Sequence, residues 1–191
     1  MNSIAELQKK VKHSHKLRIT NYDDESDDES DEELVNMSSY SGVVEYYPEE
    51  LVLTVKAGTS IKIVNEELAK NNQAFPFITE NPEQTIGSLY ATSGAELSDS
   101  VLGVQIVNGK GELLNFGGQV MKNVAGYDVS RLLVGSMGKL AIITQISFKI
   151  LPEKAAKKFQ QEAPIKNKEN SLRLIYEAKL KKVFDPYGVF I

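Results

Sequence analysis

Residues 123–152 read NVAGYDVSRLLVGSMGKLAIITQISFKILP, and this stretch decides the fold. Its second half, 140–151, is the longest run of residues that favour strands and is stopped by Pro152, which predicts a long strand. Residues 129–134 predict a short helix that ends at Gly135. The glycines of the intervening loop, GSMG at 135–138, allow the backbone to approach a ligand closely.

Two hairpins are predicted upstream of this stretch. The first pairs 42–47 with 51–56 across a Pro-Glu-Glu turn, and both runs are rich in residues that favour strands. The second pairs 101–107 with 112–116 across the tight turn 108–111. With the long strand and the helices described next, they predict an α+β fold.

Apolar residues at helical spacing predict three further helices. The first covers residues 2–12 and precedes a short strand at 17–20. The second covers 61–68, with Thr59 or Ser60 as its N-cap. The third is a closing helix that begins near residue 172.

Charge is distributed unevenly along the 191 residues. Residues 23–33 contain nine acidic residues in eleven positions and predict a disordered, solvated loop. The other 17 acidic residues stand against 22 basic ones, and 149–182 is basic. One alternative is that the loop folds over this basic end. Another is that Ser26 and Ser30 are sites for an acid-directed kinase.

These patterns divide the chain into five segments. They are an N-terminal helix and strand at 1–22, the acidic loop at 23–33, the main domain at 34–152, a polar linker at 153–171, and a C-terminal helix and tail at 172–191.

Composition excludes several classes of function. The chain has no cysteine, which rules out disulfides, thiolate metal sites and a cysteine nucleophile. Its two histidines, His13 and His15, lie in a polar stretch, so no metal site is predicted. No apolar run is long enough for a transmembrane helix or a signal peptide, so we expect a cytoplasmic protein. No nucleic-acid motif accompanies the basic end, and we expect no nucleic-acid partner.

Small residues cluster in three loops: TIGS at 85–88, ATSG at 91–94 and GSMG at 135–138. Such loops can bring backbone N–H groups close to the pyrophosphate of a dinucleotide. The alternative is that each is a plain turn.

Together with the surrounding sequence, these loops resemble a flavoprotein family. The run at 123–152 and the segment TIGSLYATSG are similar to signatures of the family typified by vanillyl-alcohol oxidase and p-cresol methylhydroxylase. GGQVMKN at 117–123 and the terminal FDPYGVF resemble, more narrowly, the FAD-binding subunits of bacterial glycolate oxidases. The resemblance covers about residues 42–152 and 172–190.

The resemblance implies an FAD-binding domain of the p-cresol methylhydroxylase type and a set of cofactor contacts. Any flavin is expected to be bound non-covalently and weakly, or to have been lost. No catalytic residue is assigned, and Asp128 is favoured as a helix cap over a flavin contact. The implied contacts are Thr85, Ile86, Gly87, Ser88, Thr92 and Gly94 on the phosphate side, and Gly126, Ser136, Gly138, Ile142 and Ile143 on the ring side.

The chain departs from the family in three respects. An acidic run follows the first strand, where relatives carry a Gly/Ser-rich phosphate loop. Ser88 and Ala141 replace glycines of the family pattern. Only 153–171 stand in place of the second, substrate domain, so most of that domain is lacking.

These departures shape the expected function. We expect an FAD-binding oxidoreductase-type subunit with a role in binding or assembly among the other subunits of a complex. Oxidation of a 2-hydroxy acid is then expected only within that complex, with the missing domain supplied by a partner. The alternative is a flavin-free, degenerate interaction module.

Overall fold

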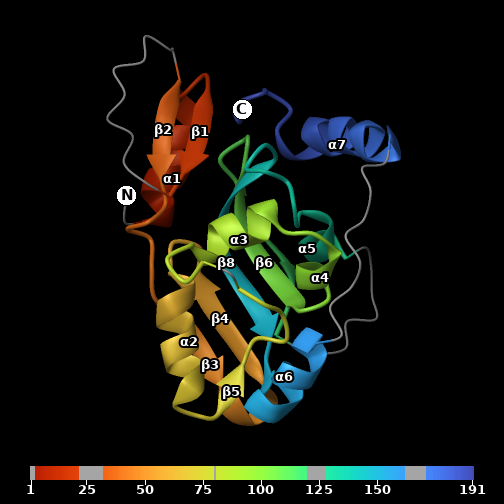
Figure 1. The fold of residues 1–191 in the computed structure, drawn as a ribbon. Helices are drawn as coiled ribbons and strands as arrows, with labels where there is room; N and C mark the ends of the chain where they lie inside the picture. Colours follow the sequence, from red (N-terminus) through yellow and green to blue (C-terminus); the bar gives the residue numbers. More distant parts are fainter. Residues whose placement is uncertain (1–2, 22–31, 80, 120–127, 162–170) are drawn as a thin grey trace.

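Strand β8 (Ala141–Lys149) lies at the centre of a five-stranded antiparallel sheet with the order β3-β4-β8-β6-β7 (Figure 1). The computed structural model describes residues 3–21, 32–79, 81–119, 128–161 and 171–191. The α+β class is confirmed. β8 pairs with β4 (Val52–Lys56) and β6 (Val101–Asn108), and the edge strands are β3 (Val43–Tyr47) and β7 (Leu113–Gly117).

The two faces of this sheet differ in chemistry because side chains alternate along each strand. One face is apolar: Leu53 pairs with Phe148 across β4 and β8, and both are fully buried. The neighbouring pair on the other face is polar, with the hydroxyls of Thr54 and Ser147 2.8 Å apart. Helices therefore pack against the apolar side.

Helices α2 (Ile61–Ala69) and α3 (Ile86–Thr92) lie beside the sheet and bury their apolar residues in the core (Figure 1). Each begins at a side-chain cap. Ser60 accepts the N–H of Ile63, and Thr85 accepts the N–H of Ser88. Two shorter helices follow, α4 (Ala95–Ser98) and α5 (Val129–Leu132).

The predicted role of Asp128 as a helix cap is confirmed. Its carboxylate accepts the N–H of Arg131 and the hydroxyl of Ser130, which fixes the start of α5. The same carboxylate forms an ion pair with the Arg131 guanidinium at 3.0 Å. These contacts satisfy the side chain locally.

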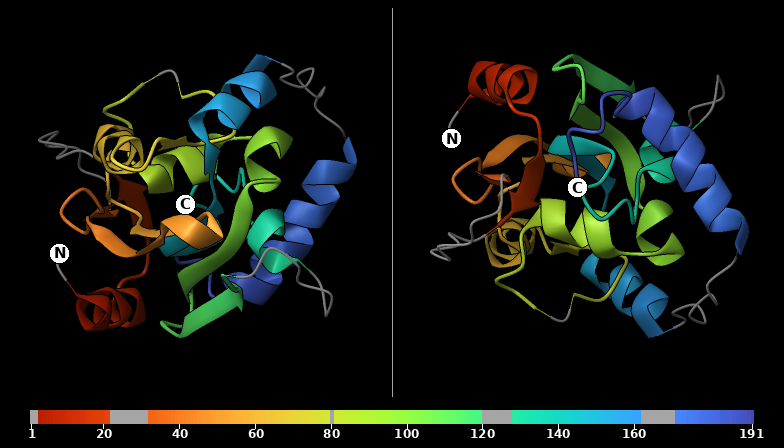
Figure 2. Two further views of the ribbon diagram at one scale, coloured as in Figure 1. Left: turned by 90° about the horizontal axis from the view of Figure 1, so that it is seen from below. Right: turned by 90° about the horizontal axis from the view of Figure 1, so that it is seen from above.

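The two ends of the chain meet at a small parallel strand pair, β1 (Leu17–Thr20) and β2 (Glu33–Asn36), which follows helix α1 (Ile4–His13). After helix α7 (Ser171–Phe184), the tail runs alongside β1 (Figure 2). The N–H of Leu17 donates to Val189 at 2.6 Å. The C-terminal tail thus extends the N-terminal strand pair.

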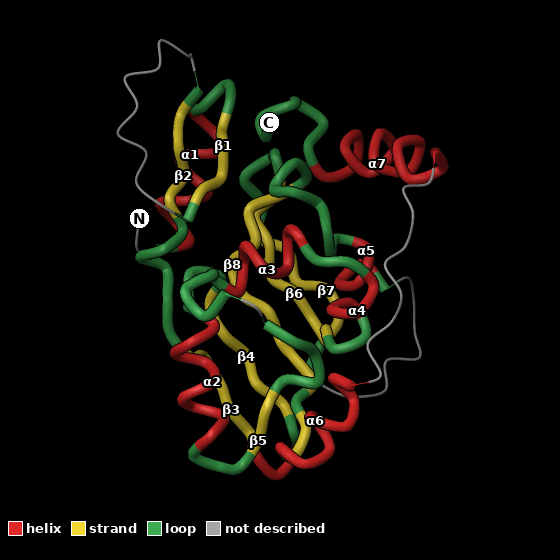
Figure 3. The backbone as a smooth tube through the Cα atoms, in the orientation of Figure 1, coloured by secondary structure: helices red, strands yellow, loops and turns green. Residues whose placement is uncertain are grey.

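The region expected to be a linker contains a helix. Strand β9 (Leu151–Pro152) pairs with β5 (Gln73–Ala74), and α6 (Glu153–Gln161) follows it directly (Figure 3). Ala156 is fully buried, and the Gln160 amide donates to the carbonyls of Phe75 and Phe77. The polar sequence concealed this helix because only a narrow face of it is apolar.

The predicted acidic loop lies mostly outside the described ranges, and its last residue, Glu33, begins β2 instead. Pro48–Glu50 form a 3-10 turn within the first hairpin. Across the described ranges, no helix combines the length and the hydropathy needed to cross a bilayer.

Candidate functional site

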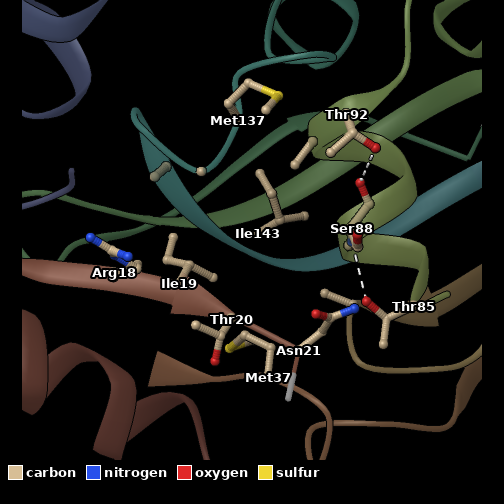
Figure 4. A pocket seen from close by; sticks show the side chains of 15 residues that line it. Arg18, Ile19, Thr20, Asn21, Met37, Thr85, Ser88, Thr92, Met137 and Ile143 are labelled. Atoms are coloured by element: carbon tan, nitrogen blue, oxygen red, sulfur yellow. Dashed lines mark hydrogen bonds between the residues drawn. The ribbon is translucent and has the colours of Figure 1, made fainter. Parts of the chain in front are cut away.

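A cavity of about 190 Å³ lies where the end of β1 meets α3, the loop 135–138 and the start of β8 (Figure 4). Ile19 and Ile143 form its apolar middle. Thr85, Ser88 and Thr92 lie together at one end, and Arg18 lies at the other. The cavity is thus apolar along its length and polar at both ends.

The structure brings six of the eleven predicted contact residues to this cavity. Ile86 and Ile142 are instead fully buried in the core. Gly94 is the N-cap of α4, and its N–H donates to the Glu96 carboxylate at 3.0 Å. Ser136 does not line the cavity, and Gly126 lies outside the described residues. The six that line it are Thr85, Gly87, Ser88, Thr92, Gly138 and Ile143.

Other lining residues were not predicted. Four of the nine come from β1 and α3, and others lie just after β1, β2 and β4, where no distinctive sequence motif marks them. Arg18 offered a signal, because a basic residue in a short strand beside a suspected anion site is informative. The residues not predicted as contacts are Arg18, Ile19, Thr20, Asn21, Met37, Ala57, Ala91, Met137 and Ala141.

The segment TIGS was expected to present backbone donors to a phosphate, but these donors are already used. Thr85 caps α3, and the following residues are helical. The N–H of Ile86 donates to Thr59 at 2.8 Å, and that of Gly87 donates to Ala57 at 2.7 Å. The N–H of Ser88 donates to the Thr85 hydroxyl at 3.2 Å. In this conformation the start of α3 offers hydroxyls to a ligand, with its first three N–H groups occupied.

Gly87 and Ser88 have different structural requirements. A Cβ at Gly87 would lie 2.9 Å from the Cβ of Ala57, so close packing of α3 on β4 requires glycine there. Ser88 lies within the helix and is not among the residues with positive φ. Serine in place of the second family glycine is therefore accommodated without backbone strain.

The last turn of α3 holds the glycine loop. The N–H of Gly135 donates to the Tyr90 carbonyl at 3.0 Å, and that of Met137 donates to Ala91 at 2.9 Å. Met137 and Gly138 both have positive φ, at 55° and 75°. The loop therefore projects Met137 and Gly138 into the cavity wall while its backbone stays tied to α3.

Tyr90 connects the end of α3 to the start of α5. Its side chain is fully buried, and its hydroxyl donates to the carbonyl of Ser130 at the start of α5. Burial raises the pKa of Tyr90 far above its ordinary value, and the nearby Asp128 carboxylate adds to the effect. The phenol therefore stays neutral and keeps its hydrogen bond to the Ser130 carbonyl, which is a structural role.

The hydroxyl oxygen of Ser136 is buried, and no group among the described residues forms a hydrogen bond with it. A buried polar atom without a partner is uncommon in proteins and calls for an explanation. It lies in the loop 135–138 but does not line the cavity, so a buried water molecule, not a ligand in the cavity, suits it as a partner.

Charge at the cavity is limited to one residue. Arg18 alone carries a charged side chain among the described residues that line it. Its guanidinium contacts the Glu32 carboxylate at 2.6 Å. The described residues contain no group of acidic residues and histidines that could hold a metal ion. Among the described lining residues, Arg18 is thus the one charged contact for a ligand.

The cavity is small. Pockets that enclose a drug-sized ligand measure about 300–1,000 Å³, and this cavity has about 190 Å³. A ligand of dinucleotide size would therefore extend beyond it.

Comparison with known proteins gives a family and several relatives. The family model of an FAD binding domain matches residues 18–117. Glycolate oxidase subunit GlcE of Escherichia coli is 40% identical over 136 residues, which cover 65% of this chain and 38% of that protein. Glycolate oxidase subunit GlcD of Bacillus subtilis is 37% identical over 78 residues, covering 41% of this chain and 17% of the relative.

A third relative is the D-lactate dehydrogenase of Archaeoglobus fulgidus, 30% identical over 105 residues, with 51% of this chain and 24% of the relative covered. The chain thus spans well under half the length of these curated relatives.

Proposed function

Since the chain belongs to the FAD binding domain family, we propose that it is an FAD-binding subunit that works within an oxidoreductase complex. It is an FAD-linked oxidoreductase domain that resembles glycolate oxidase subunits. Its own role is flavin binding or assembly. Oxidation of a 2-hydroxy acid takes place only when a partner completes the site.

The convergence of six predicted positions on one cavity carries this proposal. The hydroxyls of Thr85 and Ser88 would hold a polar part of FAD, since that of Thr92 already donates to the Ser88 carbonyl at 2.8 Å. Ile143 and Ala141 would pack against a flat part of it. A bound flavin supplies the capacity to accept a hydride or electrons from a substrate. Contacts of this kind are non-covalent, and the small cavity favours weak binding.

One observation favours a complex over independent turnover. The described lining residues include no histidine, carboxylate or lysine that could accept a substrate proton. Glycolate and D-lactate, which the names of the relatives give, are both 2-hydroxy acids, and we propose that class as the substrate of the complex.

The test is the absorbance spectrum of protein purified from a flavin-supplemented host. Flavin bands, with all of the flavin released by acid precipitation, are expected. Bands that stay with the precipitated protein would contradict non-covalent binding. A colourless protein to which added FAD also fails to bind would contradict the proposal.

A flavin-free interaction module is the second candidate. It is favoured by the occupied N–H groups at the start of α3 and by the pairing of Arg18 with Glu32. For this function the cavity would be a remnant. A variant with the cavity filled, Ala91→Leu, would then bind protein partners as well as the wild type does.

A further inference from the structure

The described residues that line this cavity offer an anion few donors. The first three N–H groups of α3 are bonded to Thr59, Ala57 and Thr85, so that end presents hydroxyls alone. The opposite end presents Arg18, the one cationic side chain among the described lining residues. A ligand with an anionic group is therefore expected to direct that group towards Arg18.

Arg18 already forms an ion pair with Glu32. Its Oε2 lies 2.6 Å from Nη2 of Arg18, and the Arg18 side chain is 55% exposed while that of Glu32 is 23% exposed. A guanidinium presents several donors that suit carboxylate and phosphate oxygens equally. The carboxylate therefore competes directly with a phosphate for the same donors.

We propose that Glu32 is a built-in competitor for the phosphate-binding function of Arg18, and that it lowers the affinity of the cavity for a pyrophosphate-bearing ligand such as FAD. This inference rests on the proposed function, and it assigns the anion contact to Arg18 instead of to the start of α3. Glu32 thereby favours ligands with a neutral group at this end.

The sequence between the cavity and Glu32 is also negatively charged. Asn21 lines the cavity and Glu32 pairs with Arg18, and the sequence between these two residues contains seven further acidic residues. The adjacent Glu33 faces elsewhere, because its carboxylate lies 3.8 Å from Nζ of Lys10. Glu33 therefore provides a matched control with the same charge one position along the chain.

The experiment compares three substitutions, Glu32→Gln, Arg18→Gln and Glu33→Gln, with the wild type. Calorimetry measures the binding of inorganic pyrophosphate, and fluorescence measures the binding of FAD and of riboflavin, which lacks phosphate. We expect E32Q to tighten FAD and pyrophosphate binding about two- to fivefold, the range for release of a half-exposed ion pair. R18Q should weaken both ligands, and riboflavin binding should not change with any variant.

The outcomes separate this inference from the proposed function. Equal tightening by E32Q and E33Q, or no loss with R18Q, overturns the inference even if FAD binds well. Tighter pyrophosphate binding by E32Q with no flavin bound by any variant supports the inference and overturns the proposed function. Failure of both pyrophosphate and FAD to bind any variant overturns both. Melting temperatures within a few degrees of the wild type would show that the variants are folded.

Discussion

The carboxylate of Asp185 lies fully buried between Lys181 and the backbone of the C-terminal tail. It accepts the N–H of Val189 at 2.8 Å and that of Phe190 at 2.9 Å, and its ion pair with Lys181 measures 2.6 Å. The tail that it fixes pairs with Leu17 in β1. Because residues of β1 line the cavity, Asp185 connects the end of the chain to the candidate site.

Asp185→Asn should therefore destabilise the protein. The amide keeps the shape but removes the charge and one acceptor, at a cost of about 2–3 kcal/mol. Urea unfolding followed by circular dichroism measures this free energy. Asp99→Asn is the control, since Asp99 is 82% exposed and pairs with Arg131 on the surface. Equal effects of the two substitutions would show that the tail is not anchored in this way.

Tyr90→Phe should lower stability by about 1–2 kcal/mol, because the Ser130 carbonyl loses a buried donor. The measurement is urea unfolding at neutral pH. Since Tyr90 supports the loop 135–138 through α3, FAD binding should weaken as well. Unchanged stability would contradict a stabilising role for the hydrogen bond from Tyr90 to the Ser130 carbonyl.

Tyr90 also predicts a pH dependence. Its pKa is raised in the folded state above the ordinary value of 10.0, so as the pH rises the unfolded protein loses this proton before the folded protein does. The stabilisation is complete below pH 10 and falls as the pH rises beyond it. The wild type should therefore lose stability relative to Tyr90→Phe above pH 10. Parallel pH profiles of the two proteins would be the contrary result.

Gly87 and Ser88 should respond differently to substitution. Gly87→Ala places a methyl group 2.9 Å from the Cβ of Ala57 and should cost about 1–3 kcal/mol. Ser88→Gly restores the family pattern within a helix and should cost only about 0.5 kcal/mol. Thermal unfolding measures both. A more stable Ser88→Gly variant would indicate that the serine is strained.

Most of the sheet could be predicted from sequence. The run 140–151 marked β8 because it is rich in residues that favour strands and is stopped by Pro152. Both hairpins and the Asp128 cap were confirmed because they depend on local patterns. Helix α6 was missed because its contact with the core rests largely on Ala156.

The candidate site was less predictable because its properties depend on tertiary contacts. The segment TIGS looks like a donor loop in sequence, yet Thr59 and Ala57 take up its N–H groups. No local pattern reveals these partners. The Arg18–Glu32 ion pair joins residues fourteen positions apart, across the acidic run, and follows from the parallel pairing of β1 and β2.

The most direct test of flavin binding at the cavity is a fluorescence titration of FAD with wild type, Ala91→Leu and Ala69→Leu. Ala91 lines the cavity, whereas Ala69 is exposed at the end of α2, so the two changes add the same side chain in different places. Saturable quenching by wild type and by Ala69→Leu, and a loss of tenfold or more in affinity for Ala91→Leu, is the predicted result. Equal quenching by all three proteins would place the flavin elsewhere and contradict the account.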